Sequence, residues 1–266
     1  MNSTSVLQAS KFTPAGKQEV HDVLTNEAPL QIHVNGEPFS VTMRTPGFEK
    51  ELVRGILHSE NVFTRKELEL RTQTMTIDDE GNVTTVNAVI PEDQFDFGFE
   101  SSRSLTSVSS CGICGKEDLS SIELCGLPLT DNSEFTLRDV NNMFDEMARY
   151  QEAFIASGGC HASAAFDQDG ELLVLREDIG RHNAVDKVIG HLIDTGKVNR
   201  AKILLVSGRV SYEIVSKAYY AGIPVLAAIS APSTLAVNIA EQFGVSLLGF
   251  CRKDKLTAFS HAQRIR

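Results

Sequence analysis

The stretch KILLVSGRVSYEIVSKAYYAGIPVLAAIS, residues 202–230, decides the fold. Two short apolar runs have the length and composition of buried strands, and the segment between them has the pattern of a helix. The same alternation continues to residue 250. The predicted elements are strand 202–207, helix 211–221, strand 224–230, helix 234–243 and strand 246–250. Strands that alternate with helices predict βαβ units, in which helices cover a parallel sheet.

The pattern extends upstream to residue 135. A helix of about 137–150 is expected to begin at Thr136 and Asp139, which are spaced as a capping pair. Two strand-like runs and a long helix then follow, and Gly196 closes that helix. These elements are expected at 160–166, 171–177 and 181–194. We therefore expect one α/β domain over residues 135–266.

A smaller α+β unit is expected over residues 26–90. Apolar residues alternate on both sides of Asn35-Gly36, which predicts a hairpin over 30–44. A helical stripe of apolar residues follows. Further strands are expected at 69–77 and 83–90.

Two segments carry no clear period. Residues 1–25 are expected to form a flexible leader. Residues 91–134 are acidic and then rich in serine, and we expect a flexible connection that carries cysteines.

Composition narrows the class of protein. The chain has 266 residues and a net charge of −10, which argues against general affinity for nucleic acid or an anionic membrane. No run of about 18 apolar residues predicts a membrane span. The polar N-terminus has no apolar signal core, so we expect a cytoplasmic protein. In a reducing compartment, five cysteines suggest a metal site or reactive thiols rather than structural disulfides.

Three predicted strands end in small, hydroxyl or basic residues. These ends are SGRVS at 207–211, SAPST at 230–234 and FCRKDK at 250–255. Ligands of open α/β sheets bind beyond the carboxyl ends of strands, and helix N-termini favour anions. On an acidic protein, this edge suggests a ligand that bears phosphate. Ordinary loop and capping residues would give the same pattern, so both interpretations stay open.

The segment REDIGRHNAVDK, residues 176–187, gathers charged and polar side chains at a strand-to-helix turn. These side chains either belong to a site or form a solvated turn with a good N-cap. A lone histidine such as His182 is more often structural than catalytic.

The segment SSCGICGK, residues 109–116, places Cys111 and Cys114 three positions apart among small residues. Structural zinc usually needs four ligands, and no second CxxC is present. Cys125, Cys160 and His161 would complete a zinc site only if they folded beside the pair. We therefore expect no metal.

A thiol carrier fits this segment better than a disulfide switch. A thioredoxin-like switch has its CxxC at a helix start after a strand, whereas a serine-rich segment precedes this one. Disulfide exchange nevertheless stays open. An exposed thiolate can hold sulfur as a persulfide and pass it on, and Lys116 favours the anion.

Six motifs together resemble one family, the formate dehydrogenase accessory sulfurtransferases or FdhD family. They occur in the family's order and span roughly residues 25–260. The motifs are SSCGICGK, GGCHASAAF, REDIGRHNAVDKVIG, SGRVSYEIVSKA, GIPVLAAISAPSTLAV and GFCRKD. The resemblance implies a cytidine deaminase-like fold for the C-terminal domain, without the deaminase zinc.

The resemblance also implies a function. Family members take persulfide sulfur from a cysteine desulfurase and deliver it to the molybdenum cofactor, a molybdenum bis(pyranopterin guanine dinucleotide). That cofactor is cargo, and it is then inserted into formate dehydrogenase. By position, the resemblance makes Cys111 the persulfide-bearing residue and Cys114 the second cysteine of the motif. The cofactor-binding stretch matches Phe250, Cys251, Arg252, Lys253, Asp254 and Lys255.

Strand-end geometry extends the expected cofactor site to Arg181, His182, Ser207 and Arg209. The alternative function is a chaperone that binds the cofactor for formate dehydrogenase without moving sulfur. A homodimer is a further expectation, since two guanine dinucleotide arms would suit two subunits.

Overall fold

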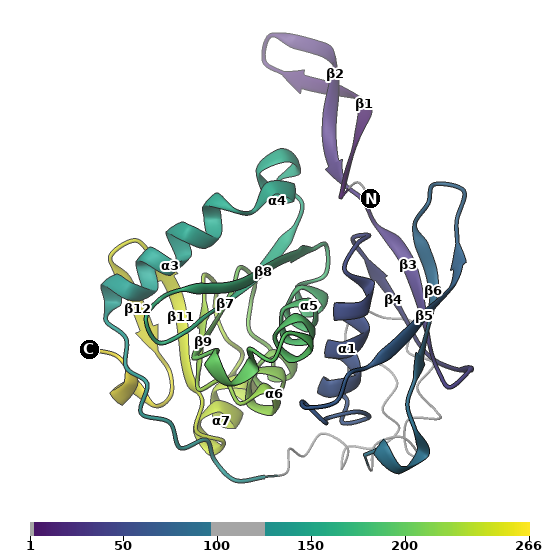
Figure 1. The fold of residues 1–266 in the computed structure, drawn as a ribbon. Coiled ribbons are helices and arrows are strands. Elements are labelled where there is room, and N and C mark those ends of the chain that lie inside the picture. Colours follow the sequence, from purple (N-terminus) through teal and green to yellow (C-terminus); the bar gives the residue numbers. More distant parts are fainter. Residues whose placement is uncertain (1–2, 97–125) are drawn as a thin grey trace.

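The computed structural model describes residues 3–96 and 126–266. They form a larger α/β domain, a smaller α+β domain beside it and an N-terminal hairpin that projects from both (Figure 1). The predicted α/β class with a smaller α+β unit is confirmed.

The larger domain has a mixed six-stranded sheet. Its helices and strands are α3 (Leu137–Arg149), α4 (Glu152–Ser157), β7 (His161–Phe166), β8 (Leu172–Asp178), α5 (Arg181–Asp194), β9 (Ile203–Val206), α6 (Tyr212–Ala221), β10 (Val225–Ala228), α7 (Thr234–Gln242), β11 (Ser246–Arg252) and β12 (Lys255–Ala258). The strand order is β12-β11-β10-β9-β7-β8. Only β9, β10 and β11 are parallel to one another, so the parallel prediction holds for the centre of the sheet and not for its flanks.

Alternation along the central strands builds two apolar layers. Leu204 and Val206 of β9 pack with the inner faces of α5, α6 and α7. Ile203 and Leu205 point to the opposite face, where they pack with α3. The sheet is therefore covered on both sides, as Figure 1 shows.

The smaller domain is a four-stranded sheet with one helix. Its elements are β3 (Ala28–Val34), β4 (Glu37–Arg44), α1 (Glu49–Ser59), β5 (Arg71–Ile77) and β6 (Val83–Val89), and the strand order is β4-β3-β6-β5. Leu52, Val53 and Leu57 of α1 are fully buried against this sheet. The predicted hairpin, helix and two strands are all confirmed.

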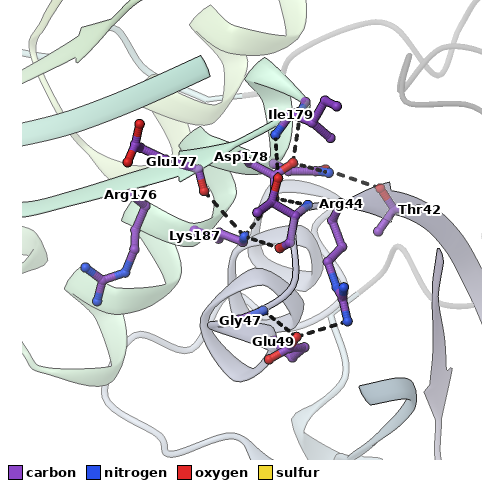
Figure 2. A network of polar contacts seen from close by, with 12 residues as sticks. Thr42, Arg44, Gly47, Glu49, Arg176, Glu177, Asp178, Ile179 and Lys187 are labelled. Carbon is purple, nitrogen blue, oxygen red and sulfur yellow. Dashed lines mark hydrogen bonds and ion pairs between the residues drawn. The ribbon is translucent and has the colours of Figure 1, made fainter. Parts of the chain in front are cut away.

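Helix α1 also packs against α5 of the larger domain. A side chain at Gly55 would collide with the backbone carbonyl of Asp186, and one at Gly190 would collide with the carbonyl of Glu51. The two helices therefore approach so closely that only glycine fits at either position. Figure 2 shows polar contacts that join the same two domains beside these helices.

The N-terminal segment differs from the flexible leader that the sequence predicts. Strands β1 (Thr4–Thr13) and β2 (Gly16–Thr25) pair along their whole length as an antiparallel hairpin. Few of its side chains are even partly buried, which is why the sequence shows no core-facing pattern there. A hydrogen bond of 2.6 Å between the hydroxyls of Thr25 and Ser157 ties the base of the hairpin to the end of α4.

Candidate functional site at the strand ends

The carboxyl ends of β9, β10 and β11 lie along one edge of the sheet because these strands are parallel. Ser207 follows β9 and Ser230 follows β10, while Cys251 lies near the end of β11. Strand β7 runs antiparallel to β9, so its first residue, His161, also lies at this edge. This is the edge at which ligands of open α/β sheets bind.

His161 and Ser207 form a hydrogen-bonded pair. The Nδ1 atom of His161 lies 3.2 Å from the Ser207 hydroxyl, which also accepts the backbone N–H of Ala162 at 3.0 Å. The backbone N–H of Ser207 donates to the Ala162 carbonyl. The strand pairing thus fixes the position of both side chains.

Gly208 is in close contact with the side chains of Arg181 and His161. A Cβ atom at this position would be 3.3 Å from Arg181 Cδ and 3.3 Å from the His161 ring. The glycine therefore lets a guanidinium stem and an imidazole pack against the same backbone. The Nε atom of Arg181 is buried and has no hydrogen-bond partner among residues 3–96 and 126–266.

A second hydrogen-bonded group lies at the start of α6. His182 Nε2 is 2.9 Å from Glu213 Oε2 and 3.1 Å from the Ser211 hydroxyl, which itself donates to Glu213. Burial alone raises the pKa of Glu213, but the hydrogen bond and charge of His182, with Ser211 and Lys217, outweigh burial and lower it. Glu213 is therefore a carboxylate at neutral pH.

The ionisation of His161 follows from its surroundings. Burial lowers the pKa of its imidazole, and the positive charges of Arg181, His182 and Arg209 lower it further. Asp178 acts in the opposite direction and is outweighed. His161 is therefore neutral at pH 7.

The other end of the edge opens into a groove between α3 and the turn after β11. The groove has a volume of about 840 Å³. Four of the residues predicted to bind the cofactor line it, together with polar side chains of α3. The lining includes Arg138, Asn141, Asn142, Asp145, Cys251, Arg252, Lys253, Asp254 and Arg266. The apolar side chains of Leu137, Phe144, Ala148 and Ile229 also line the groove. A lining that combines apolar and polar side chains is typical of ligand sites.

The turn that carries these residues is held by its backbone. Phe250 and Lys253 have left-handed φ angles of 53° and 51°. The Phe250 N–H donates to the Ser230 carbonyl at 3.2 Å, which joins this turn to the middle of the strand edge. Arg252 and Lys253 are exposed, whereas Cys251 is buried.

The structure thus brings the predicted residues together in two groups on one edge. Arg181, His182, Ser207 and Arg209 surround the β7–β9 end. Cys251, Arg252, Lys253 and Asp254 lie at the β11 end, while Phe250 and Lys255 flank them. Cys111 and Cys114 lie outside the described residues.

The sequence prediction missed several side chains that line this edge. The sequence suggests His161 only as a zinc ligand, because it does not indicate that β7 is antiparallel to β9. Ser211 is the last residue of the marked stretch 207–211 but is not assigned to the site there, and Glu213 lies two residues beyond that stretch. The α3 side chains gave no signal, because an exposed helix face has the same composition with or without a ligand.

The two cysteines within the described residues are poor nucleophiles. Burial, with the nearby charges of Glu177 and Asp178, raises the pKa of the Cys160 thiol to about 12. Burial also raises the pKa of Cys251 to about 11. Both are therefore thiols at neutral pH.

Over 3–96 and 126–266, no three His, Cys, Asp or Glu side chains are grouped so that they could hold a metal ion. Within the same ranges, no helix has the length and hydropathy of a membrane span.

Together, the fold and the site define a mixed α/β protein with cationic and hydroxyl side chains on one strand edge. The model of the FdhD/NarQ family matches residues 25–266, and the chain belongs to this family. The N-terminal hairpin lies almost wholly outside the matched residues.

Two relatives and one solved structure illustrate the similarity. The chain is 42% identical over 258 residues to the "Sulfur carrier protein FdhD" of Mycobacterium tuberculosis, with 92% of each chain covered. It is 37% identical to the protein of the same name from Sulfolobus acidocaldarius, with 97% of each covered. The crystal structure of a candidate formate dehydrogenase accessory protein from Desulfotalea psychrophila superimposes with a TM-score of 0.77 at 21% identity, over 100% of both chains.

Proposed function

We propose that this protein is a sulfur carrier for formate dehydrogenase, with Cys111 as the residue that bears the sulfur. Relatives that match nearly the whole chain are named sulfur carrier proteins. Within residues 3–96 and 126–266, the observation that favours the CxxC segment is the burial of both cysteines that the structure describes there. Cys160 and Cys251 are 7% and 2% exposed and have raised pKa values, so neither suits sulfur chemistry.

In the first step, the Cys111 thiolate attacks the outer sulfur of a persulfide on a cysteine desulfurase. A new S–S bond forms on Cys111, and the desulfurase cysteine leaves as a thiolate. Cys111 then carries a persulfide.

In the second step, Cys114 assists release. Once the cofactor is bound, the Cys114 thiolate attacks the inner sulfur of the Cys111 persulfide, which forms a Cys111–Cys114 disulfide and expels sulfide. The two thiols thus supply the electrons that convert sulfane sulfur to sulfide. The sulfide passes to the molybdenum of the bound cofactor, before the cofactor enters formate dehydrogenase. A cytoplasmic reductant returns the disulfide to two thiols.

The cofactor is cargo, and the strand edge is its proposed binding surface. The chain has a net charge of −10, yet this edge presents Arg181, Arg209, Arg252 and Lys253. A molybdenum bis(pyranopterin guanine dinucleotide) bears several phosphates, which such side chains bind. A homodimer that binds one dinucleotide arm per subunit stays a prediction.

The first test is intact-protein mass spectrometry after incubation with a cysteine desulfurase and cysteine. The wild-type chain should gain about 32 Da, one sulfur atom, and a reductant should reverse the gain. Cys111→Ala should abolish it, whereas Cys160→Ala should retain it. A full gain in Cys111→Ala would contradict the assignment.

A chaperone that binds the cofactor without moving sulfur is the alternative. It predicts that Cys111→Ala still supports formate dehydrogenase activity when the variant replaces the native chain in cells. We expect that activity to be lost.

A further inference from the structure

His161 has no part in the sulfur chemistry above, yet it lies within the cationic end of the strand edge. Its Nδ1 atom is bonded to Ser207, and its ring rests against Gly208. The Arg181 side chain rests against the same glycine, and its Nε atom is buried without a hydrogen-bond partner in the part of the chain that the structure describes. An imidazole and a guanidinium with unused bonding capacity therefore meet at one point.

The charged groups around His161 come from four places. Arg181 and His182 belong to the start of α5, and Arg209 follows β9. Asp178, at the end of β8, is already paired with Lys187 at 2.7 Å. Glu213 of α6 is paired with His182. The surroundings of His161 thus have an excess of positive charge when no ligand is bound.

A bound dianion would reverse this balance. The anion would offset the positive charges of Arg181 and Arg209. Its negative charge would then favour the protonated, imidazolium form of His161.

We propose that His161 takes up a proton when a phosphate group binds at the β7–β9 end of the strand edge, and that its imidazolium then serves as a ligand to that phosphate. The Ser207 hydroxyl sets the orientation of the ring throughout, because the strand pairing fixes it. The inference rests on the proposed function for the identity of the phosphate, which belongs to the cargo.

Coupling between proton uptake and phosphate binding can be measured as a dependence of the binding affinity on pH. A site that gains a proton on binding has an affinity that rises as the pH falls. The His161 imidazole is neutral at pH 8 without ligand and, in this proposal, is positive at pH 6 with phosphate bound. The affinity for phosphate should therefore increase as the pH falls from 8 to 6.

The test is isothermal titration calorimetry of the full chain with inorganic pyrophosphate, at pH 6 and pH 8. Each titration is repeated in two buffers of different ionisation enthalpy, which gives the number of protons taken up. His161→Asn is the matched variant, because its amide can replace Nδ1 as the partner of Ser207 but cannot titrate. The probe's own protonation is common to both proteins and cancels in the comparison.

We expect the ratio of wild-type to His161→Asn affinity to rise at least about threefold between pH 8 and pH 6. The wild-type chain should also take up more protons than the variant. Equal proton uptake in the two proteins, or no pyrophosphate binding by the wild type, would overturn the proposal. If His161→Asn does not fold, His161→Gln, which also cannot titrate but does not reproduce the Nδ1 contact to Ser207, provides the comparison of proton uptake.

Sulfur loading of the wild-type chain, measured by mass on the same preparation, keeps the two proposals apart. A chain that couples pyrophosphate binding to proton uptake but never gains 32 Da would refute the carrier function alone. A chain that gains sulfur but shows no proton coupling would refute the role of His161 alone.

Discussion

The Lys187 ammonium lies 2.7 Å from the Asp178 carboxylate, and this fully buried pair holds the smaller domain against the larger one (Figure 2). Lys187 donates to the Thr45 carbonyl at 2.9 Å, while Asp178 accepts the Thr45 N–H at 3.2 Å. The strand end of the smaller domain is thus bound through both backbone groups of one residue. Because Asp178 lies at the end of β8, the same pair also positions the turn that precedes Arg181.

Lys187→Met should therefore destabilise the protein strongly. It leaves a buried carboxylate without its cation, which typically costs about 3–5 kcal/mol. Urea unfolding followed by circular dichroism measures the change. Lys17→Met is the control, because Lys17 pairs with Glu19 on the exposed hairpin and its loss should leave the midpoint unchanged. Equal midpoints for wild type and Lys187→Met would contradict the interpretation.

Gly190→Ala should separate α1 from α5. The added methyl group would overlap the Glu51 carbonyl, so the helices have to move apart, at a cost of about 1–3 kcal/mol. Gly159→Ala is the matched control, since its Cβ would have no neighbour nearer than 3.6 Å and its backbone is unstrained. We expect thermal unfolding to show a clear fall in Tm for the first variant and little change for the second. A similar Tm in both would mean that the helix contact is not close in solution.

Alkylation of the native chain should distinguish the thiols. With pKa values of about 12 and 11, Cys160 and Cys251 are almost entirely protonated at pH 8, and both are buried. Iodoacetamide at pH 8 should label the CxxC cysteines and spare these two until the chain is unfolded. Peptide mass spectrometry identifies the sites. Rapid labelling of Cys160 in the folded protein would disprove its assignment as an inert thiol.

His58 should make stability dependent on pH. Burial, assisted by the charge of Lys66, lowers the pKa of His58 to about 4. The unfolded chain protonates near pH 6.5, so stability is complete above pH 6.5 and falls as the pH drops towards 4, by up to about 3 kcal/mol.

His58→Gln tests this dependence. The glutamine amide can retain the hydrogen bond that His58 Nε2 makes to the Tyr220 carbonyl at 3.2 Å, but it does not titrate. Between pH 7 and pH 5, the free energy of unfolding should fall more steeply in wild type than in the variant. Parallel curves would assign the pH dependence to other groups.

Charge reversal in the groove should weaken binding of the cargo. Arg252→Glu and Arg138→Glu each place a carboxylate where phosphate is proposed to bind, and we expect at least a tenfold loss of affinity. Molybdenum that copurifies after expression in a cofactor-producing host measures occupancy. Arg149→Glu is the control, because Arg149 is the last residue of α3, the helix that carries Arg138, but does not line the groove. Undiminished molybdenum in Arg138→Glu would exclude the α3 side of the groove from the site.

The sequence predicted best the elements with long, regular periods. Helix α5 has the predicted bounds 181–194, and both hydrogen bonds of the capping pair Thr136 and Asp139 are present. Helix α4 was missed because six residues are too few to establish a helical period. Strand β12 was missed because the turn before it, Lys253-Asp254, has the composition of a charged loop.

The sequence predicts some residues of the strand edge and misses others, depending on whether the residue ends or begins a strand. Ser207 and Arg209 follow a central parallel strand, so position along the chain was enough to place them on the edge. His161 begins a strand, and it reaches this edge only because β7 is antiparallel to β9. Strand direction depends on long-range pairing, which a single sequence does not display.

The close approach of α1 and α5 also limits how the gene can be recombined. At Gly55 and Gly190, the backbone of one helix occupies the space that a side chain of the other would fill, so the two helix surfaces are closely complementary in shape. Grafting residues 26–90 of one relative onto residues 135–266 of another would bring together helices shaped for different counterparts. Functional chimeras should therefore need both helices from the same parent, and crossovers should be tolerated in the N-terminal hairpin long before they are tolerated between these helices.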